Sequence, residues 1–296
     1  MGLLDGKVAL VTGAGGGLGE THALLLAKEG AAVVVKDLGG SRDGAGGGSA
    51  MADTVVEKIK AMGGQAIADY GNVAKEEDAV AMVQKAVDTF GKLDFLIANA
   101  GILRDKSFKN MTNEMWDIVI EVHLRGTYLT VKAAYNQMMN QEDGGSIVVT
   151  SSTSGLLGNF GQSNYGAAKA GIAGFARCLF QEGLKYGIRV NILAPAAWSR
   201  LTEDIFPQGQ NMEELLSPDK VSPLVVWLGS DEAKDVTGRT FLATGNTVQL
   251  LSWQSHVICQ KDNTEGPWEV AEIGDAVREH IGQWPKGIQP TPRAFE

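Results

Sequence analysis

Short runs of apolar residues alternate along the chain with segments whose apolar residues recur at helical spacing. Five runs lack polar alternation and are expected to be buried strands: Val8–Val11, Ala32–Val35, Phe95–Ala98, Ser146–Thr150 and Val190–Leu193. The intervening segments predict helices over Leu18–Glu29, Ala50–Met62, Glu76–Phe90, Asn113–Met139 and Tyr165–Tyr186. This alternation predicts a single-domain α/β protein of the Rossmann type, a doubly wound parallel sheet with helices on both faces and a ligand crevice at the carboxyl ends of its strands.

The chain has no stretch that resembles a linker between domains. The one glycine-dense stretch, Gly39–Ser49, comes too early in the 296 residues to leave a foldable fragment before it. We therefore expect one domain over residues 1–296, with a C-terminal extension around 250–296. The irregular, acidic segment around 198–219 predicts a lid over a bound ligand, and the alternative is an ordinary surface loop.

Charge and composition argue against several classes of protein. The formal net charge is -9 and no dense basic run is present, which argues against nucleic-acid binding. No apolar run is long enough to span a membrane, and neither end carries a targeting signal, so we expect a cytoplasmic protein. Cys178 and Cys259 have no His or Cys neighbours at ligand spacing, so neither a metal site nor a disulfide framework is expected.

A glycine-rich turn follows the first predicted strand and leads into the first predicted helix. It runs from Thr12 to Gly19, and its glycines allow the backbone to approach a pyrophosphate that the helix N-terminus attracts. Asp37 ends the second strand about twenty residues further on, where a carboxylate accepts hydrogen bonds from ribose hydroxyls. Taken alone, such a turn can be purely structural. With Asp37 it favours NAD, although Lys36 is a cation that could tolerate the extra phosphate of NADP.

Three polar residues are candidates for the chemistry of alcohol oxidation. Tyr165 and Lys169 are four residues apart, so a helix places both on one face. A free tyrosine has a pKa of about 10, and a nearby ammonium favours its phenolate. Ser152 follows the strand Ser146–Thr150 and can hold the substrate oxygen. Together they supply a base, a cation that tunes it and an oxygen anchor, whereas a Tyr/Lys pair in isolation is usually a solvated helix face.

Five motifs in this order resemble the short-chain dehydrogenase/reductase superfamily. They are Thr12-Gly-x-x-x-Gly17-x-Gly19, Asn99-Ala100-Gly101, Ser152, Tyr165-x-x-x-Lys169, and Pro195 after Arg189-Val-Asn. The resemblance implies a cofactor site formed by Gly13, Gly17, Leu18, Gly19, Asp37, Asn72, Val73, Asn99, Ala100, Gly101, Tyr165, Lys169, Pro195 and Ala197. It also implies that His123 stands where most members have an Asn that supports a proton relay.

Further stretches resemble the (3R)-hydroxyacyl-CoA dehydrogenase domain of the D-specific multifunctional enzymes of β-oxidation, a family also called type 4 17β-hydroxysteroid dehydrogenase. These stretches are Asp37–Ser49, Gly101–Phe108, Val122–Gly126, Gly158–Gln162 and Ser199–Thr202. The resemblance implies NAD, an acyl-CoA or steroid-type substrate, and a homodimer or homotetramer. In this superfamily the dimer contact is usually formed by the helices that correspond to Asn113–Met139 and Tyr165–Tyr186.

The resemblance favours oxidation of a (3R)-3-hydroxyacyl-CoA to the 3-oxoacyl-CoA. Two related alternatives are a dehydrogenase of free 17β-hydroxysteroids and a dehydrogenase of a CoA thioester on a steroid side chain. A third, of another class, is a non-catalytic NAD-sensing protein on the same fold. Arg104, Lys106 and Lys109 are candidates to bind CoA phosphates, or are a solvated loop. Six apolar residues are candidates to line the substrate crevice: Leu103, Leu156, Leu157, Phe160, Trp198 and Phe206.

Overall fold

A computed structural model describes residues 2–198, 211–255, 257–261, 266–280 and 282. It divides the chain into two compact units, Met1–Leu251 and Ser252–Glu296, which we describe separately. None of the described helices is long and apolar enough to cross a lipid bilayer.

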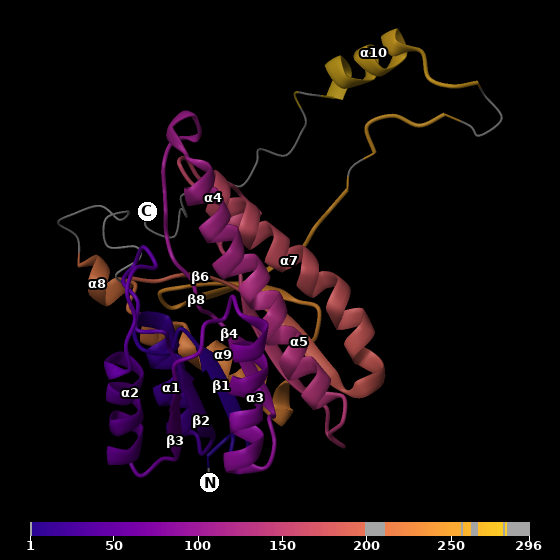
Figure 1. The fold of residues 1–296 in the computed structure, drawn as a ribbon. Helices are drawn as coiled ribbons and strands as arrows, with labels where there is room; N and C mark the ends of the chain where they lie inside the picture. Colours follow the sequence, from indigo (N-terminus) through magenta and orange to yellow (C-terminus); the bar gives the residue numbers. More distant parts are fainter. Residues whose placement is uncertain (1, 199–210, 256, 262–265, 281, 283–296) are drawn as a thin grey trace. The chain divides into compact units, whose positions relative to one another are not determined.

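The first unit is built on one eight-stranded sheet (Figure 1). Its strands are β1 (Val8–Thr12), β2 (Ala32–Lys36), β3 (Ala66–Asp69), β4 (Phe95–Ala98), β5 (Gly145–Thr150), β6 (Ile188–Ala196), β7 (Thr240–Thr244) and β8 (Thr247–Leu251). The order across the sheet is β3-β2-β1-β4-β5-β6-β7-β8, and every pair is parallel except the edge pair β7 and β8. The direction of the order reverses beside β1, so the crevice expected in a doubly wound sheet lies between β1 and β4.

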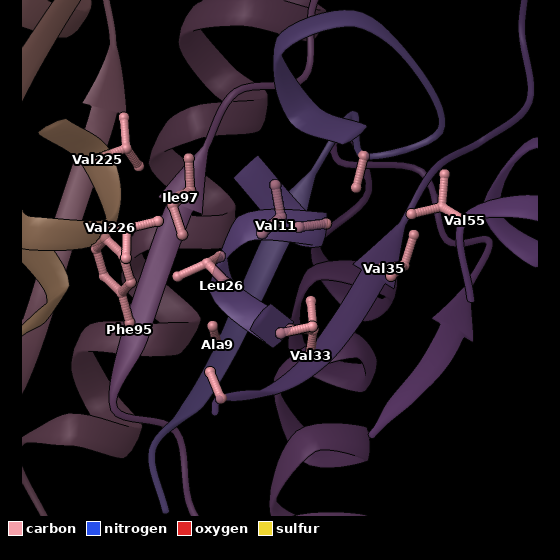
Figure 2. Close-up of a cluster of buried hydrophobic side chains, with 14 of the residues drawn as sticks. Ala9, Val11, Leu26, Val33, Val35, Val55, Phe95, Ile97, Val225 and Val226 are labelled. Carbon is pink, nitrogen blue, oxygen red and sulfur yellow. The ribbon is translucent and has the colours of Figure 1, made fainter. Parts of the chain in front are cut away.

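Helices cover both faces of this sheet. They are α1 (Gly17–Lys28), α2 (Ala50–Ala61), α3 (Glu76–Phe90), α4 (Asn113–Val119), α5 (Gly126–Met138), α6 (Thr153–Leu156), α7 (Ser163–Gly183), α8 (Met212–Leu215) and α9 (Ser222–Gly229). One face packs against α1, α2 and α9, and the other against α3, α5 and α7. Figure 2 shows the first of these cores, where Phe95 and Ile97 of β4 face Leu26 of α1 and Val226 of α9. The predicted fold is therefore confirmed.

The long helix predicted over Asn113–Met139 is broken in its middle. A π-helical segment, Ile120–Arg125, separates α4 from α5 and contains His123. A π-helical turn inserts extra backbone into a helix and re-aims its side chains, which hydrophobic periodicity does not reveal. The helical range was predicted correctly, but the π-helical segment was not. That segment places the Nε2 atom of His123 3.0 Å from the backbone N–H of Ile102.

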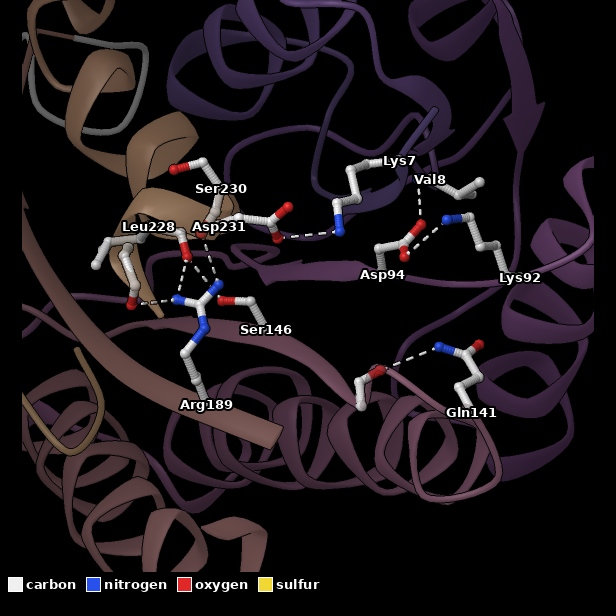
Figure 3. Close-up of polar contacts among 12 residues, drawn as sticks. Lys7, Val8, Lys92, Asp94, Gln141, Ser146, Arg189, Leu228, Ser230 and Asp231 are labelled. Carbon is white, nitrogen blue, oxygen red and sulfur yellow. Dashed lines mark hydrogen bonds and ion pairs between the residues drawn. The ribbon is translucent and has the colours of Figure 1, made fainter. Parts of the chain in front are cut away.

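Polar contacts join the amino ends of the strands to each other and to α9 (Figure 3). Asp94 accepts a hydrogen bond from the backbone N–H of Val8 at 2.7 Å and so ties the start of β1 to the start of β4. Arg189 of β6 donates to the carbonyl oxygens of Leu228 at 2.7 Å and Ser230 at 3.1 Å, at the C-terminal end of α9. A cation stabilises this end of a helix because the last carbonyls have no partner within the helix. The opposite edge, at the carboxyl ends, is left to form a site.

Three strands were not predicted. β3 contains only four residues, and β7 and β8 form a hairpin at the edge of the sheet whose outer strand is mostly exposed. Short and half-exposed strands lack the continuous apolar run on which the prediction depended.

The candidate lid around 198–219 lies partly outside the described residues, because residues 199–210 are not among them. Its described end contains α8 and the turn Pro218–Lys220. Trp198 donates its backbone N–H to the carbonyl oxygen of Leu216 at 2.7 Å, which joins the two sides of the segment. Whether the segment is a lid stays a prediction.

The second unit contains one described helix, α10 (Val270–His280), in which no residue is buried. Lys261 forms an ion pair with Glu272 at 2.6 Å, and its ammonium lies 4.8 Å from the centre of the Trp268 ring.

Truncating Phe95 tests the core. The Phe95 side chain is buried and lies directly against the backbone of Gly229, where a Cβ added to the glycine would be 2.5 Å from the ring. Because Gly229 has no side chain, it cannot fill the cavity left when the ring is removed. We expect Phe95→Ala to lower the free energy of unfolding by about 3–5 kcal/mol in urea titrations. Phe108→Ala, at a side chain that is 78% exposed, is the matched control, and we expect it to stay within about 0.5 kcal/mol of the unsubstituted protein. Equal losses would contradict this description of the core.

Candidate active site

The glycine turn joins β1 to α1 with backbone conformations that favour glycine. Gly13 has φ +66° and Gly17 has φ +55°, both in the left-handed region. Gly19 lies against the turn, where an added Cβ would be 2.0 Å from the carbonyl oxygen of Gly13. The start of α1 can therefore sit directly behind the turn and point its free N–H groups at a ligand.

A cleft of about 240 Å³ lies in front of this turn. Nine of the predicted cofactor residues line it: Gly13, Gly17, Leu18, Asp37, Asn72, Val73, Asn99, Ala100 and Gly101. Gly19, Tyr165, Lys169, Pro195 and Ala197 are not among its lining residues. The prediction missed other residues of the wall, which are Gly16, Lys36, Leu38, Gly40, Ser41, Arg42, Gly44, Ile102, Ile118 and Val122. Four of them, Gly16, Lys36, Leu38 and Ile102, lie next to a predicted cofactor residue in sequence, and Gly40, Ser41, Arg42 and Gly44 lie in the stretch Asp37–Ser49 that carries the resemblance.

Asp37 holds the backbone around the cleft. One oxygen of its carboxylate accepts a hydrogen bond from the N–H of Gly15 at 2.8 Å, and the other accepts from Gly39 at 2.7 Å. The carboxylate thereby fastens the glycine turn to the segment after β2. Any Cβ at residue 15 would lie 2.8 Å from the carboxyl carbon of Asp37, which explains why a glycine suits that position.

The ends of β1 and β4 are joined through Thr12 and Asn99. The hydroxyl of Thr12 accepts hydrogen bonds from the N–H groups of Asn99 at 2.9 Å and Ala100 at 3.1 Å. The amide of Asn99 donates to the carbonyl oxygen of Thr12 at 3.1 Å. These bonds fix the backbone on both sides of the crevice at the point where the strand order reverses.

The other predicted cofactor residues are held in two places. Asn72 accepts a hydrogen bond from the N–H of Ala74 at 2.9 Å and donates its own N–H to Asp78 at 2.7 Å, beside the buried side chain of Val73. Pro195 pairs with Ala243 of β7 near the end of β6, and Ala197 is buried just beyond it. The structure thus places the first pair in the cleft wall and the second pair at the end of a different strand.

The three candidate catalytic residues come from the end of β5 and from α7. Ser152 is buried and forms the N-cap of α6, where its hydroxyl accepts a hydrogen bond from the N–H of Ser154 at 3.1 Å. Lys169 is 3% exposed and donates from its Nζ to the carbonyl oxygen of Thr150 at 2.6 Å. Its Nζ lies 5.6 Å from the centre of the Tyr165 ring.

The electrostatic environment of this trio differs from the expectation. Burial raises the pKa of Tyr165 to about 12, while the Ser152 side chain opposes this shift and Asp105 adds to it. Burial lowers the pKa of Lys169 to about 7. Burial favours the neutral form of both groups. The ammonium was expected to lower the pKa of the phenol, but in the free protein burial of the phenol raises that pKa instead.

His123 lies against Tyr165 as a buried, uncharged ring. Its ring meets that of Tyr165 edge to face at 5.1 Å, and burial, followed by the charge of Lys169, lowers the pKa of His123 to about 3. Its Nε2 lies 3.0 Å from the N–H and 2.7 Å from the carbonyl oxygen of Ile102. Among the described residues, its buried Nδ1 has no hydrogen-bond partner. The ring is therefore placed to exchange a hydrogen bond on its Nδ1 side, in whichever tautomer it adopts.

A polar network that the sequence did not indicate extends from Ser152. Ser154 donates from its hydroxyl to Gln162 at 2.7 Å, and Gln162 donates to Asp105 at 2.7 Å. Burial raises the pKa of Asp105, against the hydrogen bond from Gln162. These residues are dispersed in sequence. Asp105 and Gln162 lie in stretches that carry the resemblance to the multifunctional enzymes, but the sequence does not indicate that their side chains meet. The network links the segment after β4 to the start of α7.

The loop cations and the apolar candidates lie in several environments. Arg104 donates to the carbonyl oxygen of Asp43 at 2.7 Å and so contacts the glycine-rich insertion, while Lys106 and Lys109 are exposed. Phe160 is 90% exposed, Leu103 is buried, and Phe206 lies outside the described residues. In the described part of the chain, no group of three or more His, Cys, Asp or Glu residues is arranged to hold a metal ion.

Comparison with known proteins identifies the family. The profile of the short chain dehydrogenase family matches residues 7–205. A short-chain type dehydrogenase/reductase of Mycobacterium tuberculosis is 49% identical over 83% of this chain and 85% of its own length. This chain belongs to the short-chain dehydrogenase family, a family of oxidoreductases, as the motifs predicted.

Two other relatives carry more specific names. The mouse peroxisomal multifunctional enzyme type 2 is 46% identical over 84% of this chain, which corresponds to 33% of that enzyme, so the chain spans about a third of its length. The hydroxyacyl-CoA dehydrogenase ChsB1 of M. tuberculosis is 37% identical over 94% of this chain and 89% of its own length. The resemblance to the multifunctional enzymes is therefore confirmed.

Solved structures agree with this assignment. A short chain dehydrogenase from Mycobacterium avium superposes with a TM-score of 0.84 at 43% identity, over 97% of this chain and 98% of that one. Carveol dehydrogenase from M. avium, solved in complex with NAD, has a TM-score of 0.74 at 27% identity, over 82% of this chain and 97% of that one.

The contact between Gly101 and His123 can be tested by adding one methyl group. A Cβ at residue 101 would lie 2.2 Å from Cε1 of His123, so Gly101→Ala must displace a buried ring. We expect a loss of about 1–3 kcal/mol in the free energy of unfolding in urea. Gly48→Ala, where no atom lies within 4 Å of the added Cβ, is the control and is expected to be neutral. If His123→Ala does not relieve the cost of Gly101→Ala in the double variant, the two residues are not in contact.

Proposed function

We propose that this chain is an NAD-dependent dehydrogenase that oxidises a (3R)-3-hydroxyacyl-CoA to the 3-oxoacyl-CoA. One observation carries the reaction class. Ser152, Tyr165 and Lys169 stand together at the carboxyl end of β5 and the start of α7, near a glycine-rich cleft between β1 and β4. A base, an oxygen anchor and a dinucleotide cleft are the parts that hydride transfer from a secondary alcohol requires.

The residues around the cleft suit NAD. The turn Gly13–Gly19 offers backbone N–H groups to a pyrophosphate, and Asp37 offers carboxylate oxygens to ribose hydroxyls. Bound NAD supplies the carbon that accepts the hydride. The NAD complex of carveol dehydrogenase from M. avium, a member of the same fold, supports this choice. On this proposal Asn99, Ala100, Gly101, Pro195 and Ala197 hold the nicotinamide end, and Asn72 and Val73 hold the adenine end.

The side chains of the chain itself handle the proton. The Ser152 hydroxyl donates a hydrogen bond to the substrate oxygen and fixes it beside Tyr165. The Tyr165 phenolate accepts the hydroxyl proton as the carbon–hydrogen bond breaks. Lys169, anchored on the carbonyl oxygen of Thr150, provides positive charge beside the phenolate when it is protonated, and the phenolate in turn favours that protonated form. His123 takes part as a neutral group, because its pKa of about 3 keeps it unprotonated at physiological pH.

The substrate class rests on the relatives. ChsB1 carries the name hydroxyacyl-CoA dehydrogenase and aligns over 94% of this chain. Arg42 lines both the cleft and a second hollow that also includes Arg104 and Lys106, so cations lie beside the cleft where an anionic carrier could bind. Free 17β-hydroxysteroids are an alternative that the first experiment separates, and CoA thioesters of steroid side chains are a second alternative within the acyl-CoA class.

We also propose that the chain works as one catalytic domain with a lid around 198–219 and an extension around 250–296, in a homodimer or homotetramer. A cytoplasmic setting belongs to the same proposal, although several relatives are named as peroxisomal proteins.

The first experiment measures NADH formation by the purified protein and by Tyr165→Phe. We expect activity with a (3R)-3-hydroxyacyl-CoA and little with its (3S) isomer or a free 17β-hydroxysteroid. Removal of the phenol should lower kcat at least about a hundredfold, because general acid–base catalysis contributes that much or more. Tyr135→Phe is the control, since Tyr135 packs against Tyr186 and takes no part in the proposed site.

The outcomes separate the candidate functions. Turnover of the free steroid without turnover of the thioester would contradict the proposed substrate but not the proposed mechanism. Full activity in Tyr165→Phe would contradict the proposed mechanism. A protein that binds NAD but oxidises none of the substrates would be the non-catalytic alternative.

The pH profile provides a second test. Since the pKa of Tyr165 is raised to about 12, the phenolate is the minor form at neutral pH, and its fraction grows as pH rises. We expect kcat/KM for alcohol oxidation to increase from about pH 6 to pH 9, and ketone reduction, which needs the protonated phenol, to stay nearly constant because the phenol is almost fully protonated throughout that range. Oxidation that slows as pH rises would contradict the assignment of Tyr165 as base.

A further inference from the structure

Lys36 is a buried lysine in the wall of the cleft. It is the last residue of β2, it is 2% exposed, and it lines the cleft together with Asp37, Asn72 and Val73. Among the described residues its Nζ makes no hydrogen bond or ion pair, yet it is not one of the fully buried polar atoms without a partner, so it keeps a small opening to the cleft that it lines. An ammonium with so little exposure to water and no hydrogen-bond acceptor of its own is costly, which suits a group that meets a ligand in the cleft.

Three carboxylates lie near this ammonium without bonding it. Burial lowers the pKa of Lys36, and the charges of Asp37, Asp69 and Asp78 act in the opposite direction. Each carboxylate has other partners. Asp37 accepts from Gly15 and Gly39, Asp69 accepts from Gly71 at 3.0 Å and lies 3.6 Å from Lys85, and Asp78 accepts from Asn72. The acidic groups therefore help to keep Lys36 charged while its N–H bonds stay available.

We propose that the ammonium of Lys36 donates a hydrogen bond to the adenosine end of the dinucleotide and so adds to the affinity and selectivity for NAD. Adenosine offers acceptor atoms, its ring nitrogens and ribose oxygens, and carries no charge of its own. Asn72, which lines the same cleft, uses its side-chain oxygen to accept the N–H of Ala74, and Lys36 adds a charged donor to the wall. The inference rests on the proposed function, in which the cofactor is NAD.

The surrounding charge argues against a phosphate as the partner of Lys36. The 2′-phosphate of NADP would bring further negative charge to a place where one ammonium already faces three carboxylates. An uncharged acceptor gains the hydrogen bond without that repulsion.

The test compares Lys36→Met with Lys85→Met. Both variants remove one positive charge near Asp69, but Lys85 is half-exposed and is not among the residues that line the cleft. Isothermal titration calorimetry measures the Kd of the purified protein for NAD, ADP-ribose and NADP, and a thermal melt without ligand measures the Tm. ADP-ribose presents the adenosine end without the nicotinamide.

We expect Lys36→Met to raise the Kd for NAD and for ADP-ribose about tenfold or more, the effect of one lost charge-assisted hydrogen bond. Lys85→Met should change either Kd by less than about twofold, since exposed ion pairs contribute little. The Tm of the free Lys36→Met protein should stay close to that of the unsubstituted protein, because the three nearby carboxylates keep their own hydrogen-bond donors and a largely buried charge has been replaced by an apolar side chain.

Three results would overturn the inference. Equal effects of the two variants would mean that only general charge matters. A loss confined to NADP would make Lys36 a phosphate ligand. A lower Tm for Lys36→Met would mean that the ammonium supports the fold. Failure of the unsubstituted protein to bind NAD or ADP-ribose would instead count against the proposed function itself.

Discussion

The hydrogen bonds between the ends of β1 and β4 determine where chemistry can take place in this protein. The Thr12 hydroxyl accepts from Asn99 and Ala100, and the Asn99 amide returns a bond to Thr12. Both strands are buried on both faces, so their carboxyl ends are the places where backbone can turn outward to meet a ligand. The glycine turn, the Asp37 carboxylate and the start of α1 all take their positions from that junction.

Burial determines the direction of the pKa shifts of Tyr165 and Lys169, which lie near this junction with Ser152. In the free protein it favours the neutral phenol of Tyr165 and the neutral amine of Lys169, with His123 uncharged beside them. A catalytic group with a perturbed pKa in a cleft is what acid–base chemistry requires. The same property recurs at Lys36, where burial again opposes charge and nearby carboxylates support it. The cleft wall and the neighbouring candidate catalytic residues thus each include a lysine whose charge depends on what surrounds it.

The sequence predicted the parts of the fold that repeat a strong pattern. Continuous apolar runs gave β1, β2, β4, β5 and β6, and helical spacing gave the main helices. It did not predict the π-helical turn around His123, because one extra residue in a helical turn does not change the overall periodicity. Nor did it predict the Asp105–Gln162 network, which depends on contacts between residues 57 positions apart. The lowered pKa of Lys169 was also missed, since burial depth is a property of the packed structure.

The most direct measurement follows the hydrogen at C3 of the substrate. A (3R)-3-hydroxyacyl-CoA deuterated at C3 is incubated with the protein and NAD, and the nicotinamide product is examined by mass spectrometry. Direct hydride transfer predicts NADH that carries the deuterium, formed slowly or not at all by Tyr165→Phe. NADH without the label, or labelled NADH formed equally fast by Tyr165→Phe, would contradict a dehydrogenase that works through Ser152, Tyr165 and Lys169.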